Sequence, residues 1–273
     1  MIKLSIVTLT YNNHNQLKKT LDSFKIFKND FHNIELIIID SSDKSIFLDN
    51  KILLFNLLGN NINYSQYYLN PIGIYNSMNY GLTKCKGDYL IFMNSSDSFY
   101  ENFNIKRFFD LIDKNKEKNS SKYPFLIYGR SKINSSINPD LTYFNPPLNI
   151  SPDKKISWNK FIPPMHQACF FNKEWHIKNF YPLNRGYRSD EIIKRKALIS
   201  SLFIDEIICN YELSGISSLN NLKTSEIIIN SIKTRSLNRF LINFAKIFFI
   251  RIFPKKWEYI RFYKTFILSK LLP

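Results

Sequence analysis

The stretch that decides the fold is KLSIVTLTYNNHNQLKKTLDSF, residues 3–24. Residues 3–9 are apolar and rich in β-branched side chains, a pattern that predicts a buried strand. Three asparagines after the strand favour a turn or a helix N-cap. Leu17, Leu21 and Phe24 then recur at the spacing of one helix face. A buried strand followed by an amphipathic helix is the repeating unit of a parallel α/β sheet.

The same alternation continues along the chain. Further strands are predicted at 35–39, 62–69, 88–93, 124–128, 166–171 and 202–211, and helices at 74–84, 103–113 and 189–199. Residues 114–122 are expected to form a polar loop, and the segment 134–155, rich in Asn, Pro and Ser, a loop or lid. The fold class is therefore α/β, a doubly wound, mainly parallel sheet with flanking helices. Right-handed crossovers place the carboxyl ends of parallel strands on one edge, where such sheets bind ligands.

Composition narrows the function classes. The chain has 273 residues, 44% of them hydrophobic, which is enough apolar material for a packed core. Its three cysteines lie far apart, which argues against a disulfide framework and a structural zinc site. The sequence contains no Walker A loop, G-x-G-x-x-G or G-x-S-x-G motif. P-loop kinase, dehydrogenase and α/β-hydrolase functions are therefore excluded.

The net charge of +16 is concentrated at the C-terminus. Residues 221–273 hold 11 basic and 2 acidic side chains, a net charge of +9. Basic amphipathic helices are expected at 225–253 and 255–268, which divides the chain into a domain of residues 1–220 and a helical tail of residues 221–273. Aromatic side chains alternate with the basic ones, which favours attachment to an anionic membrane surface; alternatively, the aromatic face packs on the domain. Nucleic acid is the weaker candidate partner, because no recognition module is present.

The expected location is cytoplasmic, peripheral on the inner face of the membrane. No run of 18 apolar residues occurs, and the first residues lack a signal-peptide pattern.

Polar residues follow three predicted strands. Thr10 and Tyr11 follow the first strand, Asp40 the second, and Ser96 and Asp97 the strand at 88–93. The Asp97 carboxylate could hold Mg²⁺ or Mn²⁺ beside substrate phosphates, or Asp97 could open the next helix as an N-cap. Asp40 could bind a ribose or base, or form a turn. The Tyr11 ring could stack on a base or simply pack.

Two further positions have both a chemical and a structural interpretation. His166 opens a predicted strand, either as a satisfied polar group or as a functional one, and the four histidines show no metal-binding spacing. Asp190 and Glu191 open a predicted helix, where the helix dipole favours carboxylates. The chemical alternative for this pair is a general base.

Three segments form an ordered set of motifs: IKLSIVTLTYNNHNQLKKTLDSF, IELIIIDSSDKS and NPIGIYNSMNYGLTKCKGDYLIFMNSSDSFY. This set resembles the family 2 glycosyltransferases of the GT-A fold, in particular the bacterial branch that builds lipooligosaccharide, capsule and exopolysaccharide. It covers about residues 2–115, the expected nucleotide-sugar half. PPMHQACFF and YRSDEIIKRKAL are more weakly similar to the acceptor half, expected at 116–220.

The resemblance implies a reaction: inverting, metal-dependent transfer of a sugar from a nucleotide-diphospho-sugar, UDP-linked by preference, to a glycan or lipid-linked hydroxyl. It implies the following roles: Asp97 binds Mn²⁺ or Mg²⁺, Asp190 is the catalytic base, Asp40 contacts the nucleoside, Asn79 forms a wall of the donor pocket, and His166 and Gln167 line the site near the diphosphate or acceptor. Thr10, Tyr11 and Ser96 are expected to bind the nucleotide-sugar.

Three departures from the family pattern support a second hypothesis. Ser96, Asn76 and Ile192 stand where relatives often carry carboxylates. A degenerate member that binds a nucleotide-sugar or a partner without turnover is therefore the alternative to an active enzyme. Release of a nucleoside diphosphate in the presence of Mn²⁺ would distinguish the two.

Overall fold

The computed structural model describes residues 3–59, 62–117, 123–134, 142–148, 164–212 and 263. The contacts divide the chain into two compact units, residues 1–132 with 144–211 and residues 133–143 with 212–273. Every site residue discussed below belongs to the first unit. The predicted boundary at residue 220 and the predicted helices of the tail, apart from Tyr263, lie outside the described residues.

Strands and helices alternate through the first half of the chain. They are β1 (Leu4–Thr10), α1 (His14–Ser23), β2 (Ile34–Asp40), α2 (Lys44–Leu58), β3 (Asn63–Tyr68), α3 (Ile74–Lys84), β4 (Tyr89–Phe92), β5 (Ser98–Phe99) and α4 (Ile105–Glu117). The second half adds β6 (Leu126–Asn134), β7 (Thr142–Asn145), the 3₁₀ turn η3 (His166–Ala168), β8 (Cys169–Asn172), α6 (Lys173–Ile177), η4 (Leu183–Arg188), α7 (Ser189–Ala197) and β9 (Ser201–Glu212).

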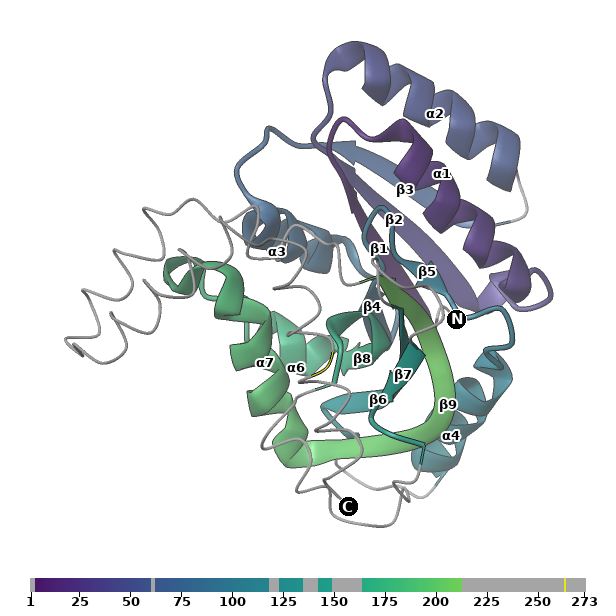
Figure 1. Cartoon of the computed structure of the whole chain (residues 1–273), viewed down its shortest axis with the longest axis vertical. Helices are drawn as coiled ribbons and strands as arrows, with labels where there is room; N and C mark the ends of the chain where they lie inside the picture. The colour runs from purple at the N-terminus through teal and green to yellow at the C-terminus, as the bar shows by residue number, and fades with distance from the viewer. Residues whose placement is uncertain are drawn as a thin grey trace. The chain divides into compact units, whose positions relative to one another are not determined.

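The described strands form one mixed sheet in the order β3-β2-β1-β4-β8-β6-β9-β5, with β7 paired to β6 (Figure 1). β1 runs parallel to β2 and β4, and β2 runs parallel to β3. β8 runs antiparallel to β4 and β6, and β5 runs antiparallel to β9. The expected mixed α/β sheet with flanking helices is confirmed.

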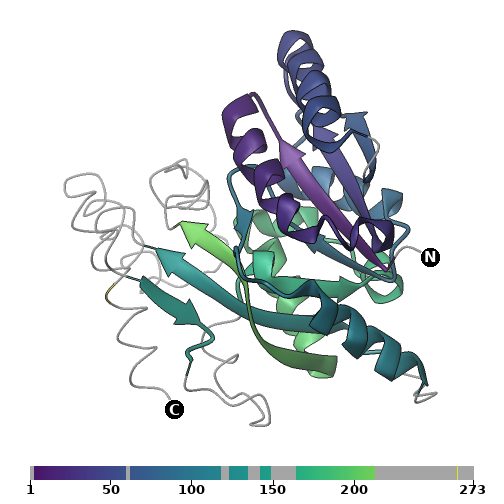
Figure 2. The ribbon, with the colours of Figure 1, turned by 90° about the vertical axis from the view of Figure 1, so that its right-hand side faces the viewer.

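The two faces of the sheet bury different helices. Leu4 and Ile6 of β1 belong to a core that includes the apolar faces of α1, α2 and α4, and Figure 2 shows α1 lying along β1. Val7 points to the opposite face and packs with α3 and α7. This alternation follows from the two-residue period of a strand.

α3 lies directly on the sheet because Gly81 has no side chain. A Cβ atom at Gly81 would lie 2.7 Å from Cγ1 of Val7 and 3.3 Å from Cγ1 of Ile39. The glycine therefore sets the distance between α3 and the strands β1 and β2.

Three local predictions are corrected. α4 continues to Glu117, so residues 114–117 are helical rather than loop, because Lys and Glu in this stretch are good helix formers. β7 lies within the expected loop 134–155. The strand expected from His166 begins at Cys169, after the turn η3. α2 was not predicted, because its apolar residues cover most of its circumference and obscure the helical period.

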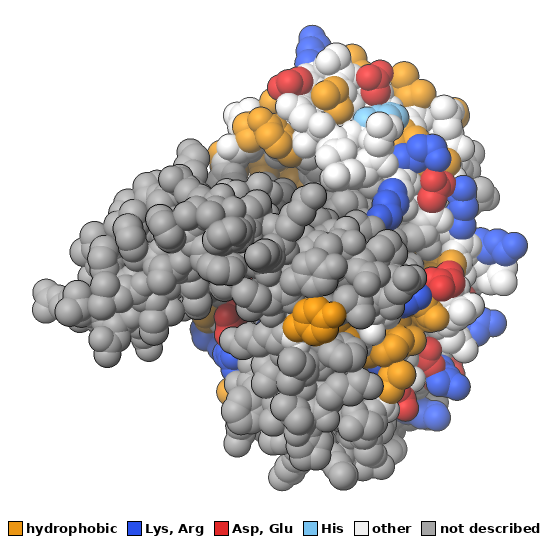
Figure 3. All heavy atoms as spheres, in the orientation of Figure 1, with side chains coloured by type: hydrophobic (Ala, Val, Ile, Leu, Met, Phe, Trp, Pro, Cys, Tyr) orange, Lys and Arg blue, Asp and Glu red, His pale blue; other side chains and the backbone are white. Residues whose placement is uncertain are grey.

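Within the described ranges, no helix is long and apolar enough to cross a membrane. Acidic and basic side chains are interspersed on the described part of the face that Figure 3 presents.

Candidate functional site

The loops after β1, β2 and β4 meet at the carboxyl edge of the parallel strands. Asn12 has a φ of +48° and ties two of them together: its backbone N–H donates to Ser42 Oγ at 2.8 Å, and its Oδ1 accepts from the backbone N–H of Asp43 at 2.8 Å. Tyr11 is 59% exposed beside this junction. At this edge, two loops are therefore held together by hydrogen bonds, and the ring of Tyr11 beside them is exposed.

Asp40 ends β2 and is fully buried. Its Oδ1 accepts from the backbone N–H of Ser42 at 2.9 Å, and its Oδ2 accepts from Asn50 at 2.8 Å and Gln66 at 3.0 Å. Asn50 lies on α2 and Gln66 on β3, so the carboxylate joins three elements. Contact between Asp40 and a nucleoside stays a prediction. Asn50 and Gln66 were not predicted, since their roles depend on tertiary proximity.

Asp97 lies in a turn after β4, where its backbone N–H donates to the carbonyl of Asn94 at 2.9 Å. The preceding residue, Ser96, is exposed and has a φ of +87°, in the left-handed region that L side chains rarely adopt. Gln167 of η3 donates from Nε2 to Asp97 Oδ2 at 2.8 Å. The structure thus brings together Asp97 and Gln167, which are 70 residues apart.

Within the described residues, several buried oxygen atoms in β1, β3 and the turn after β4 have no hydrogen-bond partner. These are Oγ1 of Thr8 and Thr10, Oε1 of Gln66, Oδ1 of Asn94 and Oγ of Ser95. A buried polar atom without a hydrogen bond lowers the free energy of unfolding by about 1–3 kcal/mol. Because most buried polar atoms in folded proteins are hydrogen-bonded, these exceptions need an explanation. Thr10, Asn94 and Ser95 flank the turn that carries Asp97, and their oxygen atoms could serve a ligand there.

Asp190 is the second residue of α7, and its side chain is 26% exposed. The Tyr75 hydroxyl donates to Asp190 Oδ1 at 3.1 Å, and Lys194 Nζ lies 3.2 Å from Oδ2. Burial alone would raise the pKa of Asp190, but Lys194, His166 and the backbone N–H of Glu191 together hold the pKa below its usual value. Tyr75 and Lys194 were not predicted as site residues. The only available signals were the GIY motif and the i,i+4 spacing on α7.

His166 is buried in a hydrogen-bonded cluster. Its Nε2 lies 2.7 Å from the hydroxyl of Tyr181, which lies 3.1 Å from Nε2 of His176. Burial lowers the pKa of His166 to about 3 and that of His176 to about 4. Both rings are therefore neutral near pH 7. His166 contributes to the packing of this region, and its predicted contact with a ligand stays a prediction.

Asn79 fixes the same cluster from α3. Its Nδ2 donates to the carbonyl of Tyr181 at 3.0 Å, and its Oδ1 accepts from the Tyr181 N–H at 2.9 Å. This two-point bond spans 102 residues of sequence. Asn79 therefore anchors the segment before α7, and its predicted place in a donor pocket wall stays a prediction.

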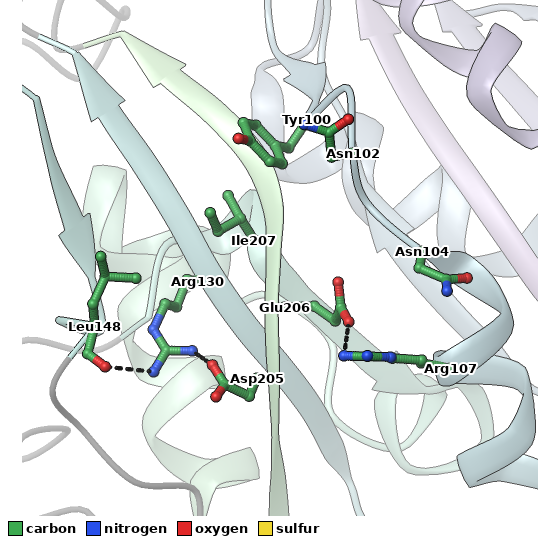
Figure 4. A pocket seen from close by; sticks show the side chains of 9 residues that line it. All are labelled: Tyr100, Asn102, Asn104, Arg107, Arg130, Leu148, Asp205, Glu206 and Ile207. Atoms are coloured by element: carbon green, nitrogen blue, oxygen red, sulfur yellow. Dashed lines mark hydrogen bonds and ion pairs between the residues drawn. The ribbon is translucent and has the colours of Figure 1, made fainter.

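Two depressions of the described surface lie apart from these residues. The larger, about 430 Å³, is lined by Tyr100, Asn102, Asn104, Arg107, Arg130, Leu148, Asp205, Glu206 and Ile207 (Figure 4). Its charged side chains pair with one another, Arg130 with Asp205 and Arg107 with Glu206. The smaller, about 280 Å³, is lined by His14, Asp49, Ile52, Leu53 and Asn56. No predicted site residue lines either one.

Solved structures similar to this chain confirm the fold. TarS of S. aureus, residues 1–349 in complex with UDP-GlcNAc, superposes with a TM-score of 0.58 at 14% identity, covering 98% of this chain and 81% of that one. The TarS complex with UDP gives 0.55 at 16% identity, covering 78% and 61%. The mannosyltransferase PcManGT of Pyrobaculum calidifontis, in complex with GDP-Man and Mn²⁺, gives 0.53 at 11%, covering 99% and 76%.

Sequence comparisons give the family. An uncharacterized glycosyltransferase of Rickettsia conorii is 26% identical over 157 residues, which is 58% of this chain and 23% of that protein. The chain thus spans about a quarter of that relative's length. The model of the family described as Glycosyl transferase family 2 matches residues 5–192, well over half of the chain. The chain therefore belongs to glycosyl transferase family 2.

Proposed function

We propose that this chain transfers a sugar from a nucleotide-diphospho-sugar to a hydroxyl group of a glycan or glycolipid, with inversion at the anomeric carbon. The observation that carries the proposal is the carboxyl edge of the sheet, where Asp97 and the unpartnered oxygens of Thr10, Asn94 and Ser95 occur together. A uridine diphosphate donor carrying a hexosyl or N-acetylhexosaminyl group is favoured, since TarS was solved with UDP and UDP-GlcNAc. The motifs favour an acceptor of bacterial surface polysaccharide.

Asp190 would supply the base. Its carboxylate accepts the proton of the acceptor hydroxyl, and the acceptor oxygen then forms a bond to the anomeric carbon. The bond from that carbon to the diphosphate breaks on the opposite face, and the nucleoside diphosphate leaves with the bonding electrons. General bases contribute roughly 10²–10⁴-fold to such steps.

The other edge residues would bind and orient the donor. Tyr11 is exposed and could stack on the base, and the buried Thr10 hydroxyl could hydrogen-bond the donor. Ser96 presents an exposed hydroxyl in the turn next to Asp97, and Gln167 fixes the Asp97 carboxylate. Holding two substrates in a reactive geometry supplies much of the remaining acceleration.

The chemistry of the turn at 94–97 fits a divalent cation. Hard cations such as Mg²⁺ and Mn²⁺ bind oxygen ligands, commonly one or two carboxylates together with substrate phosphates. Asp97 provides the carboxylate, and the unpartnered oxygens of Asn94 and Ser95 lie in the same turn. Within the described residues no group of three or more His, Cys, Asp and Glu side chains lies together, so the substrate would complete the shell. Bound there, the cation would neutralise charge on the leaving diphosphate.

The test is a panel of nucleotide-sugars in the presence of Mn²⁺. The true donor should raise the melting temperature, since a ligand at 100 times its Kd adds about 2.7 kcal/mol. The same donor should release a nucleoside diphosphate when an acceptor is present. A panel in which no nucleotide-sugar stabilises the protein would refute the proposal.

A degenerate binding protein remains the second candidate. The pairing of Asp190 with Lys194 favours it, because a carboxylate with a lowered pKa is a weaker base. Ser96, Asn76 and Ile192 also stand where relatives often carry acids, and Asn76 bonds to the carbonyl of Ile72 at 2.7 Å. Donor stabilisation without nucleoside diphosphate release, across all acceptors tried, would favour this candidate.

The basic tail, residues 221–273, would bring the enzyme to the inner face of the cytoplasmic membrane. Its net charge is +9, and a lipid-linked acceptor is found at such a surface. On this proposal residues 1–220 form the catalytic domain, with a nucleotide-sugar half (1–115) and an acceptor half (116–220).

A further inference from the structure

We infer that Tyr75 and Lys194 are positioning residues that hold the carboxylate of Asp190 at both of its oxygens. The inference rests on the proposed function, in which Asp190 is the base. It goes beyond that function by assigning roles to a side chain of α3 and a buried lysine of α7.

The contacts come from two directions. Tyr75 lies in the first turn of α3, 115 residues before Asp190, and its hydroxyl donates to Oδ1 at 3.1 Å. Lys194 lies one helical turn after Asp190, and its Nζ lies 3.2 Å from Oδ2. The two carboxylate oxygens together accept about four hydrogen bonds; Tyr75, Lys194 and the backbone N–H of Glu191 supply three, so one position is left for an acceptor hydroxyl. The carboxylate is thus oriented without being saturated.

Lys194 is held in place by burial. Its side chain is only 8% exposed, and a buried ammonium needs an anion beside it. Asp190 is the anion of this pair. The attraction between them therefore limits rotation of both side chains.

The Tyr75 ring is fixed by a rigid neighbour. It packs against the ring of Tyr181, with centroids 5.5 Å apart and planes 30° apart. Tyr181 is itself held by the two-point bond from Asn79 and by the hydroxyl contacts to His166 and His176. Burial raises the pKa of Tyr75 well above its usual value, so the hydroxyl keeps its proton and stays a donor.

The histidine tautomers follow from the same network. His176 Nδ1 lies 3.0 Å from the carbonyl of Asn179, so it must donate, and Nε2 of the neutral ring must accept. The Tyr181 hydroxyl therefore donates to His176 and accepts from Nε2 of His166. The hydrogen bonds thus run from His166 to the Tyr181 hydroxyl and from that hydroxyl to His176, and they fix the position of the Tyr181 ring.

Removal of either donor should destabilise the charged form of Asp190. The titratable groups that act on Asp190 are Tyr75 from α3, His166 from η3, Cys169 from β8, Tyr181 before α7, and Lys194 from α7 itself. Both histidines are neutral near pH 7, and burial raises the pKa of Cys169 to about 12. Lys194 is therefore the one positive charge of this set between pH 5 and 8. Tyr75 is the neutral hydrogen-bond donor that acts on Asp190 beside it.

The experiment compares pH profiles of kcat/KM for the acceptor. Tyr75→Phe should move the acidic limb of the profile to higher pH by about one unit. It should also lower kcat about tenfold at pH 7, because the Asp190 carboxylate loses its orientation. KM for the donor should be unchanged. Lys194→Met should move the limb further, and Lys194→Arg should restore part of it. Tyr80→Phe is the matched control, because Tyr80 lies on the same helix but contacts Tyr67 and Lys84. Its profile should equal that of the parent.

A double-variant cycle separates this inference from the proposed function. If Asp190→Asn lowers kcat by roughly 10²–10⁴-fold and Tyr75→Phe does not lower the residual rate further in that background, the two residues act as one unit. If Asp190→Asn abolishes turnover but Tyr75→Phe and Lys194→Met keep the parent's pH profile, the inference is wrong and the proposed base stands. If Asp190→Asn keeps full turnover, the proposed base itself is wrong. Carboxyl ¹³C NMR titration of Asp190 in the parent and in Tyr75→Phe gives the shift without an activity assay.

Discussion

Asp40 and Asp97 follow neighbouring strands at the same edge, but their surroundings differ. Asp40 is fully buried, and three donors of the protein satisfy its carboxylate. Asp97 is half-buried and accepts from Gln167, in a turn that contains unpartnered oxygens. The first arrangement stabilises the loop after β2, whereas the second places a half-buried carboxylate in the turn after β4.

Replacement of Asp97 by Asn should abolish metal-dependent sugar transfer and leave the fold intact. An amide lacks the charge that holds a divalent cation, while the half-buried site tolerates an isosteric side chain. The measurement is nucleoside diphosphate release across a Mn²⁺ titration, with far-UV circular dichroism for the fold. Asp49→Asn, an exposed position on α2, should behave like the parent. Full activity of Asp97→Asn at saturating Mn²⁺ would show that the metal assignment is wrong.

At the level of elements, contact between α3 and the sheet positions both Tyr75 and Asn79. Gly81 permits that contact, since a Cβ there would lie 2.7 Å from Val7 Cγ1. Val7 is a core residue with a stiff β-branched side chain, so it cannot easily give way.

Gly81→Ala should therefore lower the free energy of unfolding by about 1–2 kcal/mol. Overpacking costs about 1–3 kcal/mol, and the stiff Val7 side chain places this position at about 2–3 kcal/mol, of which the better helix propensity of alanine offsets about 1 kcal/mol. Urea denaturation of the parent and the variant gives the difference. Thr83→Ala, at an exposed position of the same helix, should be neutral or slightly stabilising. Equal stability of Gly81→Ala and the parent would contradict the close approach.

The buried histidines link η3 to α6 through Tyr181 and should make stability depend on pH. The pKa values of about 3 for His166 and about 4 for His176 lie below the unfolded value of about 6.5. The unfolded chain therefore takes up protons below about pH 6.5 that the folded chain does not. Stability is complete above that pH and falls as the pH decreases toward 4, by about 2 kcal/mol for each histidine between pH 7 and 5.

Urea denaturation at pH 7.5, 6 and 5 measures this loss. His176→Gln should remove about half of the pH dependence, whereas His32→Gln, at an exposed position, should leave it unchanged. An unaltered pH dependence in His176→Gln would mean that this ring is not buried in its neutral form.

At the scale of the whole molecule, the positive charge is unevenly distributed along the chain. The last 53 residues carry a net charge of +9 out of the total of +16. Each basic side chain near an anionic membrane is worth about 1 kcal/mol. The tail therefore carries enough charge for reversible attachment if half of its basic groups reach the surface.

The full chain should float with vesicles containing anionic phosphatidylglycerol at low salt and be released at high salt, because exposed charges are screened within about 10 Å at 0.1 M. Replacement of Lys255, Lys256, Arg261 and Lys264 by Gln should weaken flotation while donor-induced stabilisation persists. Equal flotation of the two proteins would contradict attachment through these basic side chains, and failure of the full chain to float would favour packing of the aromatic face on the rest of the chain.

The sequence by itself determined the alternation of strands and helices, because apolar periodicity is a local property of the chain. α3 was predicted at its observed bounds, 74–84, and β1, β2 and β4 within one residue at each end. The placement of Thr10, Asp40 and Asp97 at one edge followed from the rule that parallel strands share a direction. Asp190 and Gln167 came from motifs rather than from periodicity.

Only the tertiary structure decided which side chains meet. The partners of Asp40 come from α2 and β3, that of Asp97 from η3, and that of Asp190 from α3. These contacts join residues 10 to 115 positions apart, and no local pattern encodes them. Packing of α3, η3 and α7 in the folded chain places Tyr75 next to the carboxylate of Asp190 and Gln167 next to that of Asp97. That is a consequence of the folded core, so the chemistry of each acid follows from its neighbours in space rather than in sequence.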